Sequence, residues 1–241
     1  MSLLEISQMS TGYRGVAVVR QLDLRVDEGE VVALLGPNGA GKTSTLLAIS
    51  ALGELMAGDI KVLGRSIRGR RPHLIAREGL AHVPEDRGLF FRLTVREHLR
   101  LNAGRRSNMI EQALAWFPAL APLIDHRAGL LSGGEQQMLA LAQALTTDPR
   151  LIIIDELSLG LAPILVARLL PVLRQIATST GAGVLLVEQH VHLALEVADQ
   201  AHVLNHGRLA LADDASRLRS EPERLTASYL TGSADSTSQV C

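Results

Sequence analysis

Four short apolar runs recur along the chain, each bounded by glycine or charged residues: 31–35, 80–83, 151–154 and 184–187. Uninterrupted apolar runs of this length are typical of strands buried on both faces, as in a largely parallel sheet. Helical periodicity separates them, notably over 43–52, 135–145 and 163–180. The last segment has Pro163 in its first turn and stops at Gly181, as helix punctuation favours. The alternation predicts an α/β fold.

Three regions depart from this alternation. Residues 2–28 predict short antiparallel strands ahead of the first parallel one, and residues 201–212 predict a hairpin turned at Asn205-His206-Gly207. Residues 90–130 contain no convincing strand and carry helical patches at 94–101 and 109–117, so we interpret them as a helical insertion. Residues 232–241 are rich in Ser and Thr and predict a disordered tail.

We therefore expect one domain over residues 1–231. It would consist of a core formed by 1–85 and 141–231, with a mainly parallel sheet, and a helical subdomain at about 86–140. The length of 241 residues is ample for a buried core of this kind.

Charge and composition narrow the class of protein. The 24 Lys and Arg residues against 25 Asp and Glu give a net charge of -1, so the basic field of a nucleic-acid-binding protein is missing. The one cysteine, Cys241, allows no internal disulfide, which favours a reducing cytoplasm. The amino end has no signal-peptide pattern, and every apolar run falls far short of the roughly 18 residues that cross a bilayer. Any membrane role therefore requires a partner.

A phosphate-binding motif follows the first buried strand and opens a helix. Its residues, here called the phosphate loop, fit G-x-x-x-x-G-K-[ST]: Gly36, Pro37, Asn38, Gly39, Ala40, Gly41, Lys42 and Thr43. The glycines let backbone N–H groups turn inward around a β-phosphate, and Lys42 reaches the β and γ oxygens. The Thr43 hydroxyl can ligate Mg²⁺. We expect an ATP site here and include the next residue, Ser44, among the nucleotide-binding candidates.

Two adjacent carboxylates, Asp155 and Glu156, end the apolar run 151–154. Neighbouring negative charges at a strand end are unfavourable unless a cation compensates, and Mg²⁺ would do so. We expect Asp155 to hold the metal through water and Glu156 to act as general base on the attacking water. The alternative, that both carboxylates cap the following turn, is disfavoured by the phosphate loop.

A second candidate phosphate site comprises Ser132, Gly133, Gly134 and Glu135. Ser132 followed by Glu135 is also a capping box at the start of a helix. The two glycines leave helix-terminal N–H groups open to an anion, which a capping box alone would not require. We therefore favour a second phosphate site. A GTPase is disfavoured because the chain has no Asn-Lys-x-Asp motif.

With these motifs in this order, the chain resembles the nucleotide-binding subunits of ABC transporters from Leu3 to about Gly207. The resemblance implies that Tyr13 stacks on adenine beside Val18, and that 132–135 form the signature. Two subunits, identical or not, then close head to tail, with each ATP between one phosphate loop and the partner's signature. It also implies integral membrane permease subunits, an indirect link to a substrate-binding protein, and a peripheral place on the cytoplasmic face of the inner membrane.

Several positions depart from the commonest pattern of that family. Glu85 stands where most members carry glutamine, and a carboxylate there can still hold metal-bound water. Gln189, followed by His190, stands where a histidine usually senses the γ-phosphate; its amide can donate a hydrogen bond but carries no proton or charge. Leu157 replaces the proline after the catalytic glutamate. The catalytic candidates are Lys42, Glu156 and Gln189, and the metal candidates are Thr43, Glu85 and Asp155.

Within that family, the chain resembles the LivF-type ATP-binding subunits of branched-chain amino acid importers. Four segments together carry this resemblance: 83–85, 131–138, 158–163 and 185–189. That resemblance implies uptake driven by MgATP hydrolysis, with 158–161 signalling between two ATP sites. We expect residues 85–97 and the helical insertion to contact the membrane subunits, because this stretch lies between the two phosphate sites and has no other assigned role.

Three alternatives stay open. The transporter could carry another cargo, such as urea, short amides or other amino acids. The chain could be a soluble ABC ATPase, although neither a second ATPase core nor a coiled coil is present, or a regulatory module that binds ATP with little turnover.

The basic cluster Arg65, Arg68, Arg70 and Arg71 is interpreted as a solvated loop.

Overall fold

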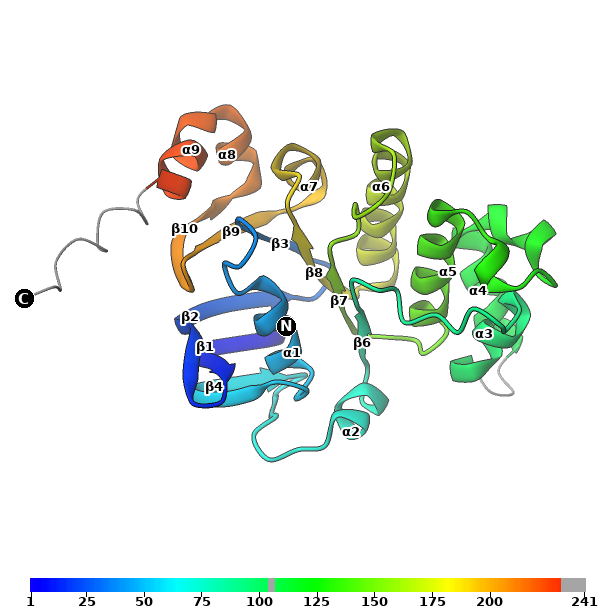
Figure 1. Cartoon of the computed structure of the whole chain (residues 1–241), viewed down its shortest axis with the longest axis horizontal. Helices are drawn as coiled ribbons and strands as arrows, with labels where there is room; N and C mark the ends of the chain where they lie inside the picture. Colours follow the sequence, from blue (N-terminus) through cyan, green and yellow to red (C-terminus); the bar gives the residue numbers. More distant parts are fainter. Residues whose placement is uncertain (104–106, 231–241) are drawn as a thin grey trace, which may run out of the picture.

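A computed structural model describes residues 1–103 and 107–230. Its larger sheet has six strands in the order β10-β9-β3-β8-β7-β6 (Figure 1). β10 pairs antiparallel with β9, and all other neighbours are parallel. The strands are β3 (Val31–Leu35), β6 (Leu80–Val83), β7 (Leu151–Asp155), β8 (Gly183–Glu188), β9 (Gln200–Asn205) and β10 (Arg208–Asp214). The four predicted buried strands are therefore confirmed, as is the hairpin, whose turn places His206 and Gly207 at positive φ.

The second sheet is antiparallel, in the order β2-β1-β4-β5. It contains β1 (Ser2–Tyr13), β2 (Val16–Asp27), β4 (Glu54–Val62) and β5 (Arg65–Ser66). The antiparallel strands expected over 2–28 are confirmed, while β4 and β5 were not predicted.

The basic cluster differs from its expected form. Arg65 lies in β5, and the guanidinium groups of Arg65 and Arg70 both pair with the Glu78 carboxylate. Arg68 donates a hydrogen bond to the Gly58 carbonyl. Three of the four arginines therefore hold this region together, although they remain at the surface.

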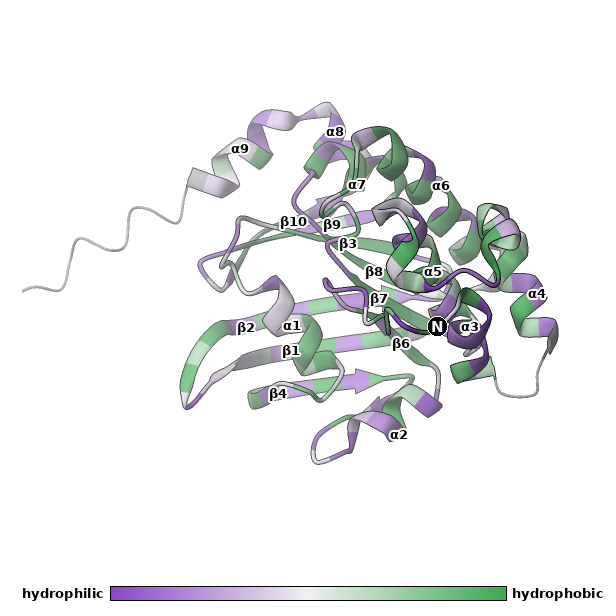
Figure 2. Cartoon of the chain, turned by 45° about the vertical axis from the view of Figure 1, so that its right-hand side comes forward, coloured by the Kyte–Doolittle hydropathy of each residue, from purple (hydrophilic) through white to green (hydrophobic). Residues whose placement is uncertain are grey.

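Alternate side chains of the parallel strands enter two separate cores. Val31, Ala33 and Leu35 belong to a core covered by helices, whereas Val32 and Leu34 face the antiparallel sheet and α1. Figure 2 shows the central strands as the most hydrophobic part of the fold. The helices outside the insertion are α1 (Lys42–Ile49), α2 (Pro72–Arg77), α5 (Gly133–Leu145), α6 (Pro163–Thr180), α7 (Val191–Val197), α8 (Ala215–Ser220) and α9 (Pro222–Leu230).

The insertion is helical, as predicted. It contains α3 (Val95–Ala103), α4 (Ser107–Trp116) and two short 3₁₀ helices, η1 (Pro118–Leu123) and η2 (Ala128–Leu130), and lies at one end of the molecule (Figure 1). The expected boundary at residue 140 lies within α5, and the expected tail at 232–241 lies outside the described residues. The domain limits stay a prediction. Among the residues that the structure describes, no helix combines the length and apolar character needed to cross a bilayer.

Candidate functional site

The phosphate loop depends on glycine for its path. Gly36, Gly39 and Gly41 have φ values of 153°, 78° and 106°, which L side chains rarely adopt. A Cβ on Gly36 would lie 2.2 Å from the Leu204 carbonyl oxygen, and one on Gly41 would lie 2.4 Å from Val19 Cγ2. The loop leads directly into α1, whose first N–H groups receive no side-chain cap. Those donors remain available for an anion.

Lys42 is buried and turned back onto the phosphate loop. Its Nζ donates to the carbonyl oxygens of Gly36 at 2.9 Å and Pro37 at 3.1 Å, and lies 3.8 Å from Glu156 Oε1. Burial lowers the pKa of Lys42, while the Glu156 carboxylate acts in the opposite direction. The lysine thus faces a carboxylate from the end of β7.

Glu156 is held from two sides. Its backbone has φ 48° and its N–H donates to the Val187 carbonyl at 3.1 Å, while Gln189 Nε2 donates to its Oε1 at 2.6 Å. These groups meet because parallel strands β3, β7 and β8 end at the same edge of the sheet. They line a cleft of about 390 Å³ with Val18, Asn38, Gly39, Gly41, Lys42, Thr43, Ser44, Glu85 and Leu159.

Asp155 is 2% exposed, and burial raises its pKa to about 6, against the opposing effect of a hydrogen bond with Thr43. Its Oδ1 has no hydrogen-bond partner within the described residues. Thr43, Glu85 and Asp155 line one neighbouring cavity, so the structure brings the predicted metal candidates together.

This donor set fits Mg²⁺. In residues 1–103 and 107–230, no cluster of three or more His, Cys, Asp or Glu side chains could hold a metal ion. Mg²⁺ usually keeps several waters and is bound through one or two carboxylates together with substrate phosphates. A buried carboxylate oxygen without a partner, beside a hydroxyl at the phosphate loop, suits that mode of binding.

Tyr13 ends β1 close to this cleft. Its ring is 52% exposed, and its hydroxyl accepts a hydrogen bond of 3.4 Å from Ser44 Oγ. Val18 lines the cleft itself. An exposed aromatic face beside a phosphate loop is available for stacking on a base.

The second predicted phosphate site lies at the start of α5. Ser132 N–H donates to Glu135 Oε2 at 2.7 Å, and Glu135 N–H donates to Ser132 Oγ at 3.4 Å, so the capping box is present. None of the four residues 132–135 lines the Lys42 cleft in the part of the chain that the structure describes. Within one chain, the two predicted phosphate sites are therefore separate.

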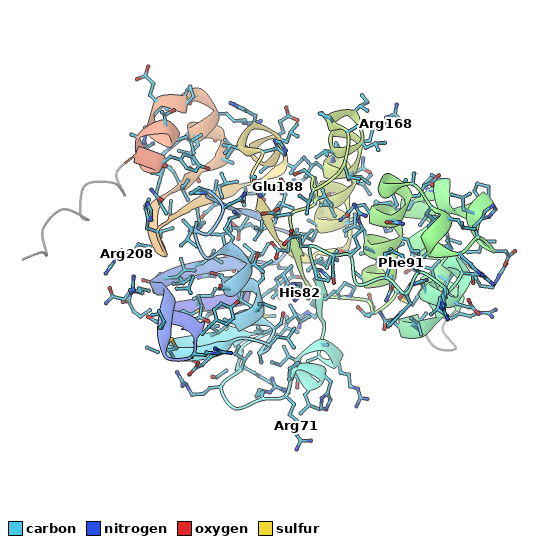
Figure 3. The ribbon with its side chains drawn as sticks, in the orientation of Figure 1. Arg71, His82, Phe91, Arg168, Glu188 and Arg208 are labelled. Carbon is cyan, nitrogen blue, oxygen red and sulfur yellow. The ribbon has the colours of Figure 1, made fainter. Side chains whose placement is uncertain are left out.

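The sequence interpretation missed Glu188. Its carboxylate is fully buried and accepts hydrogen bonds from Ser158 N–H at 2.9 Å and Ser158 Oγ at 2.7 Å, near the centre of the molecule in Figure 3. Burial raises the pKa of Glu188. Its position after the apolar residues 183–187 repeats the pattern of Asp155 and was the available signal. It fixes the start of segment 158–161.

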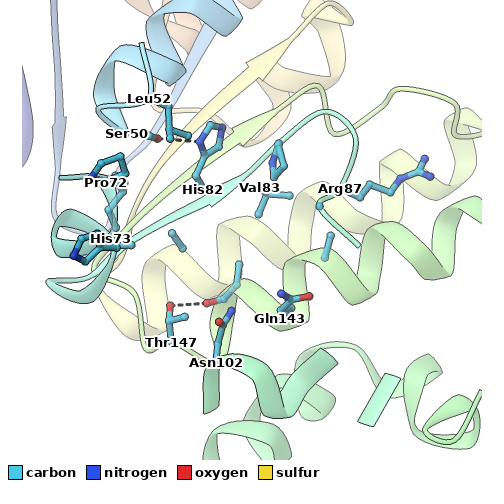
Figure 4. A pocket seen from close by; sticks show the side chains of 17 residues that line it. Ser50, Leu52, Pro72, His73, His82, Val83, Arg87, Asn102, Gln143 and Thr147 are labelled. Carbon is cyan, nitrogen blue, oxygen red and sulfur yellow. Dashed lines mark hydrogen bonds between the residues drawn. The ribbon is translucent and has the colours of Figure 1, made fainter. Parts of the chain in front are cut away.

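A groove of about 470 Å³ lies between β6, α2 and α5 (Figure 4). At its wall, the His82 ring hydrogen-bonds to Ser50 Oγ through Nδ1 at 2.9 Å, and burial lowers the pKa of His82 to about 4. Two and three residues after Gly88, which lines the groove, Phe90 and Phe91 are 62% and 61% exposed. Two adjacent exposed aromatic residues mark a surface suited to a protein partner.

Comparison with known proteins identifies the family. The sequence profile described as "ABC transporter" matches residues 19–158, more than half of the chain. The chain belongs to the ABC transporter family. This ABC ATPase is 36% identical over 235 residues to BraG of Pseudomonas aeruginosa, a high-affinity branched-chain amino acid transport ATP-binding protein, covering 95% of this chain and all of BraG.

The names of two other relatives of this ABC ATPase describe branched-chain amino acid transport and lipopolysaccharide export. It is 32% identical to the probable branched-chain amino acid transport protein LivF of Archaeoglobus fulgidus, over 90% of this chain and 94% of that one. It is also 32% identical to the lipopolysaccharide export ATP-binding protein LptB of Escherichia coli, over 87% and 89%. A solved ATP-binding subunit of an ABC transporter superposes with a TM-score of 0.81 at 31% identity, over 95% and 98%. The chain is therefore an ATPase, the ATP-binding subunit of an ABC transporter.

Proposed function

We propose that this subunit belongs to an importer in which MgATP hydrolysis at a head-to-tail dimer interface drives the uptake of branched-chain amino acids. The observation that supports hydrolysis most directly is the placement of Glu156. Its carboxylate lies 3.8 Å from Lys42 Nζ and accepts a hydrogen bond from Gln189, at the mouth of the phosphate loop. A carboxylate fixed there can take a proton from a water beside the γ-phosphate.

The remaining residues of the cleft bind and orient ATP. Backbone N–H groups of the phosphate loop receive the β-phosphate, and Lys42 exchanges its carbonyl partners for phosphate oxygens. Tyr13 and Val18 take the adenine. Thr43 and Asp155 would hold Mg²⁺, with Glu85 on its water; when bound, the ion neutralises charge developing on the phosphates. Gln189 orients the Glu156 carboxylate and carries no proton itself.

The second copy would complete each ATP site. Ser132, Gly133, Gly134 and Glu135 lie outside the Lys42 cleft of their own chain. The capping box engages the N–H groups of Ser132 and Glu135, so the helix-terminal N–H groups that suit an anion held by another chain are those of Gly133 and Gly134. The partner can be an identical or a related ATPase. Closing the pair would exclude water from both sites and assemble the donors around the γ-phosphate.

Permease subunits would bind at the groove and at residues 85–97. The exposed Phe90 and Phe91 rings offer an apolar contact, and Glu85 connects this surface to the ATP cleft. The subunit would then sit peripherally on the cytoplasmic face of the inner membrane. A substrate-binding protein would act on it only indirectly, through the permease.

Two named relatives support the cargo. BraG and LivF are both described as branched-chain amino acid transport proteins, and the BraG match spans that whole chain. LptB, at similar identity, makes lipopolysaccharide export the main competing function. Urea, short amides and other amino acids are further candidate cargoes, since the cleft residues described above are assigned to ATP and do not select the transported substrate.

Hydrolysis is tested by Glu156→Gln, which keeps the shape of the side chain and removes its basicity. We expect ATP binding to persist and turnover to fall below detection, with a dimer appearing on size exclusion only when ATP and Mg²⁺ are present. Asp148→Asn, a surface change in the loop before β7, serves as the matched control. Turnover near wild type in Glu156→Gln would remove Glu156 as the base.

Cargo is tested by uptake of labelled leucine, isoleucine and valine in cells of the source organism that carry Glu156→Gln at matched expression. We expect uptake of these three to be lost, with an unrelated amino acid and surface lipopolysaccharide unaffected. Normal uptake, in cells without a second copy of the gene for this subunit, would contradict branched-chain amino acids as the cargo. A loss of surface lipopolysaccharide would point to lipopolysaccharide export instead.

A further inference from the structure

Arg87 lies where three segments of the fold meet. It follows β6 and lines the end of the groove away from His73 (Figure 4). Its guanidinium donates through Nε to Gln137 Oε1 at 3.0 Å, through Nη1 to Gln136 Oε1 at 2.9 Å, and through Nη2 to the Leu159 carbonyl at 3.3 Å. One side chain thus joins the loop after β6, the start of α5 and segment 158–161.

The contacts continue to the residues of the signature. Gln136 uses its own amide N–H groups on the carbonyl oxygens of Ala128 and Leu131, the residues leading to Ser132. A Cβ on Gly133 or on Gly160 would lie 3.8 Å from Arg87 Nη2, so the guanidinium lies near both glycines with room for ordinary contact. The signature and segment 158–161 therefore share one support.

The charge of Arg87 has an unusual environment. No carboxylate lies within salt-bridge distance of its guanidinium among the residues that the structure describes; its acceptors are two side-chain amides and a backbone carbonyl. A planar fork with donors in fixed directions can hold three such acceptors at once, which a lysine ammonium cannot match in geometry.

The backbone at Arg87 also indicates a constraint. Its φ is 67°, and its N–H donates to the Pro84 carbonyl at 2.9 Å, which closes a tight turn before Gly88. The left-handed region disfavours residues with a Cβ, so glycine would suit this position better. The three side-chain hydrogen bonds of Arg87 hold it in this backbone conformation.

We propose that Arg87 is a positioning residue that fixes the signature and segment 158–161 relative to each other, so that both meet a second copy together when ATP closes the dimer. The inference rests on the proposed function. Arg87 does not line the ATP cleft, so it acts on dimer closure and turnover and leaves nucleotide binding to the monomer unchanged. Because it also lines the groove, a permease segment seated there acts on both interface elements through this residue.

The test uses the full chain with Glu156→Gln, in which ATP accumulates the dimer. Arg87→Gly removes the side chain while suiting the backbone, and thermal unfolding measured beside the parent shows that the variant is folded under the conditions of the test. We expect the protein concentration for half-dimerisation in ATP to rise about tenfold or more, the scale of one lost charge-assisted hydrogen bond. Affinity for a fluorescent ATP analogue, measured below the dimerisation range, stays within about twofold. Arg87→Lys restores only part of the dimer.

Arg25→Gln is the matched control, because Arg25 donates through Nε and Nη2 to Asp27 Oδ1 entirely within β2. It leaves dimerisation unchanged. Equal dimerisation of Arg87→Gly and its parent, or an equal loss in Arg25→Gln, overturns the proposal.

A second readout separates this proposal from the proposed function. With Glu156 intact, Arg87→Gly lowers kcat about tenfold with KM within about twofold. If Glu156→Gln never dimerises in ATP, the proposed head-to-tail dimer is wrong. The kcat and KM of Arg87→Gly still test the role of Arg87 in that case. An unchanged kcat, or an effect on KM alone, overturns its positioning role.

Discussion

Single side chains of the cleft have well-separated tasks. Lys42 is buried against its own loop, and Gln189 fixes Glu156 by a short hydrogen bond. In the neighbouring cavity, Asp155 has a carboxylate oxygen that no described residue hydrogen-bonds. Each task depends on the type of the residue and on its burial, because charges interact strongly only where water is excluded. Substitutions here therefore have sharply different expected effects.

Lys42→Ala is expected to weaken ATP binding by about 2 kcal/mol or more, because it removes charge-assisted hydrogen bonds to phosphate. Titration with a fluorescent ATP analogue measures the change. Lys61→Ala is the natural control, since Lys61 is the chain's other lysine and pairs at the surface with Glu5. Unchanged binding in Lys42→Ala would contradict the phosphate-loop assignment.

His202 predicts a dependence of stability on pH. Burial lowers its pKa to about 4 from 6.5, so the unfolded chain binds this proton more tightly. The stability due to the neutral ring is complete above pH 6.5 and is lost as pH falls toward 4, by about 3 kcal/mol. His202→Leu should flatten this decline in urea unfolding at pH 7 and 5, whereas the exposed His206→Gln should not. Parallel declines in all three proteins would contradict the prediction.

At the scale of elements, the phosphate loop shows how one strand-to-helix connection is shaped by its neighbours. Gly36 approaches the backbone of β9, whereas a Cβ added to Gly39 would meet no described atom within 4 Å. Both glycines have positive φ, 153° at Gly36 and 78° at Gly39, and only Gly36 is crowded by backbone.

Gly39→Ala is expected to lower the free energy of unfolding by about 1 kcal/mol, the cost of a left-handed alanine. Gly36→Ala should lower it by about 2 kcal/mol more, because a Cβ 2.2 Å from the Leu204 carbonyl oxygen forces the backbone to move. Chemical denaturation of both variants beside wild type measures the difference. An equal decrease in the free energy of unfolding in both variants would mean that the backbone at Gly36 moves away from the Leu204 carbonyl without an energetic penalty.

Sequence patterns predicted the elements that carry a strong local signal. The buried strands are uninterrupted apolar runs, and α6 begins and ends at Pro163 and Gly181. β4 was missed because Gly58 and charged side chains interrupt its pattern. Arg87 was missed for a different reason: its partners Gln136 and Leu159 are 49 and 72 residues away, so no local motif marks the contact.

At the scale of the whole molecule, the helical insertion and the sheet share one core. Leu99 and Phe117 of the insertion belong to the same buried cluster as Val31 and Ile154 of the sheet. A continuous apolar core couples the stabilities of its parts. This supports the prediction of a single domain over residues 1–231.

Unfolding should therefore be cooperative. Trp116, the only tryptophan, reports on the insertion, while far-ultraviolet circular dichroism reports on the whole chain. We expect the two urea transitions to coincide, and Leu99→Ala to shift both together by about 2–5 kcal/mol. An earlier tryptophan transition would mean that the insertion unfolds by itself.

The hydrogen bonds from Lys42 to Gly36 and Pro37 have a consequence for the rate and heat of nucleotide capture. They hold the loop in its curved path before any ligand arrives, so the conformational entropy of ordering it is lost during folding instead of on binding. ATP then meets a preorganised receptor. Its association should be fast and enthalpy-driven, with little of the ordering penalty that a disordered loop would add to each encounter.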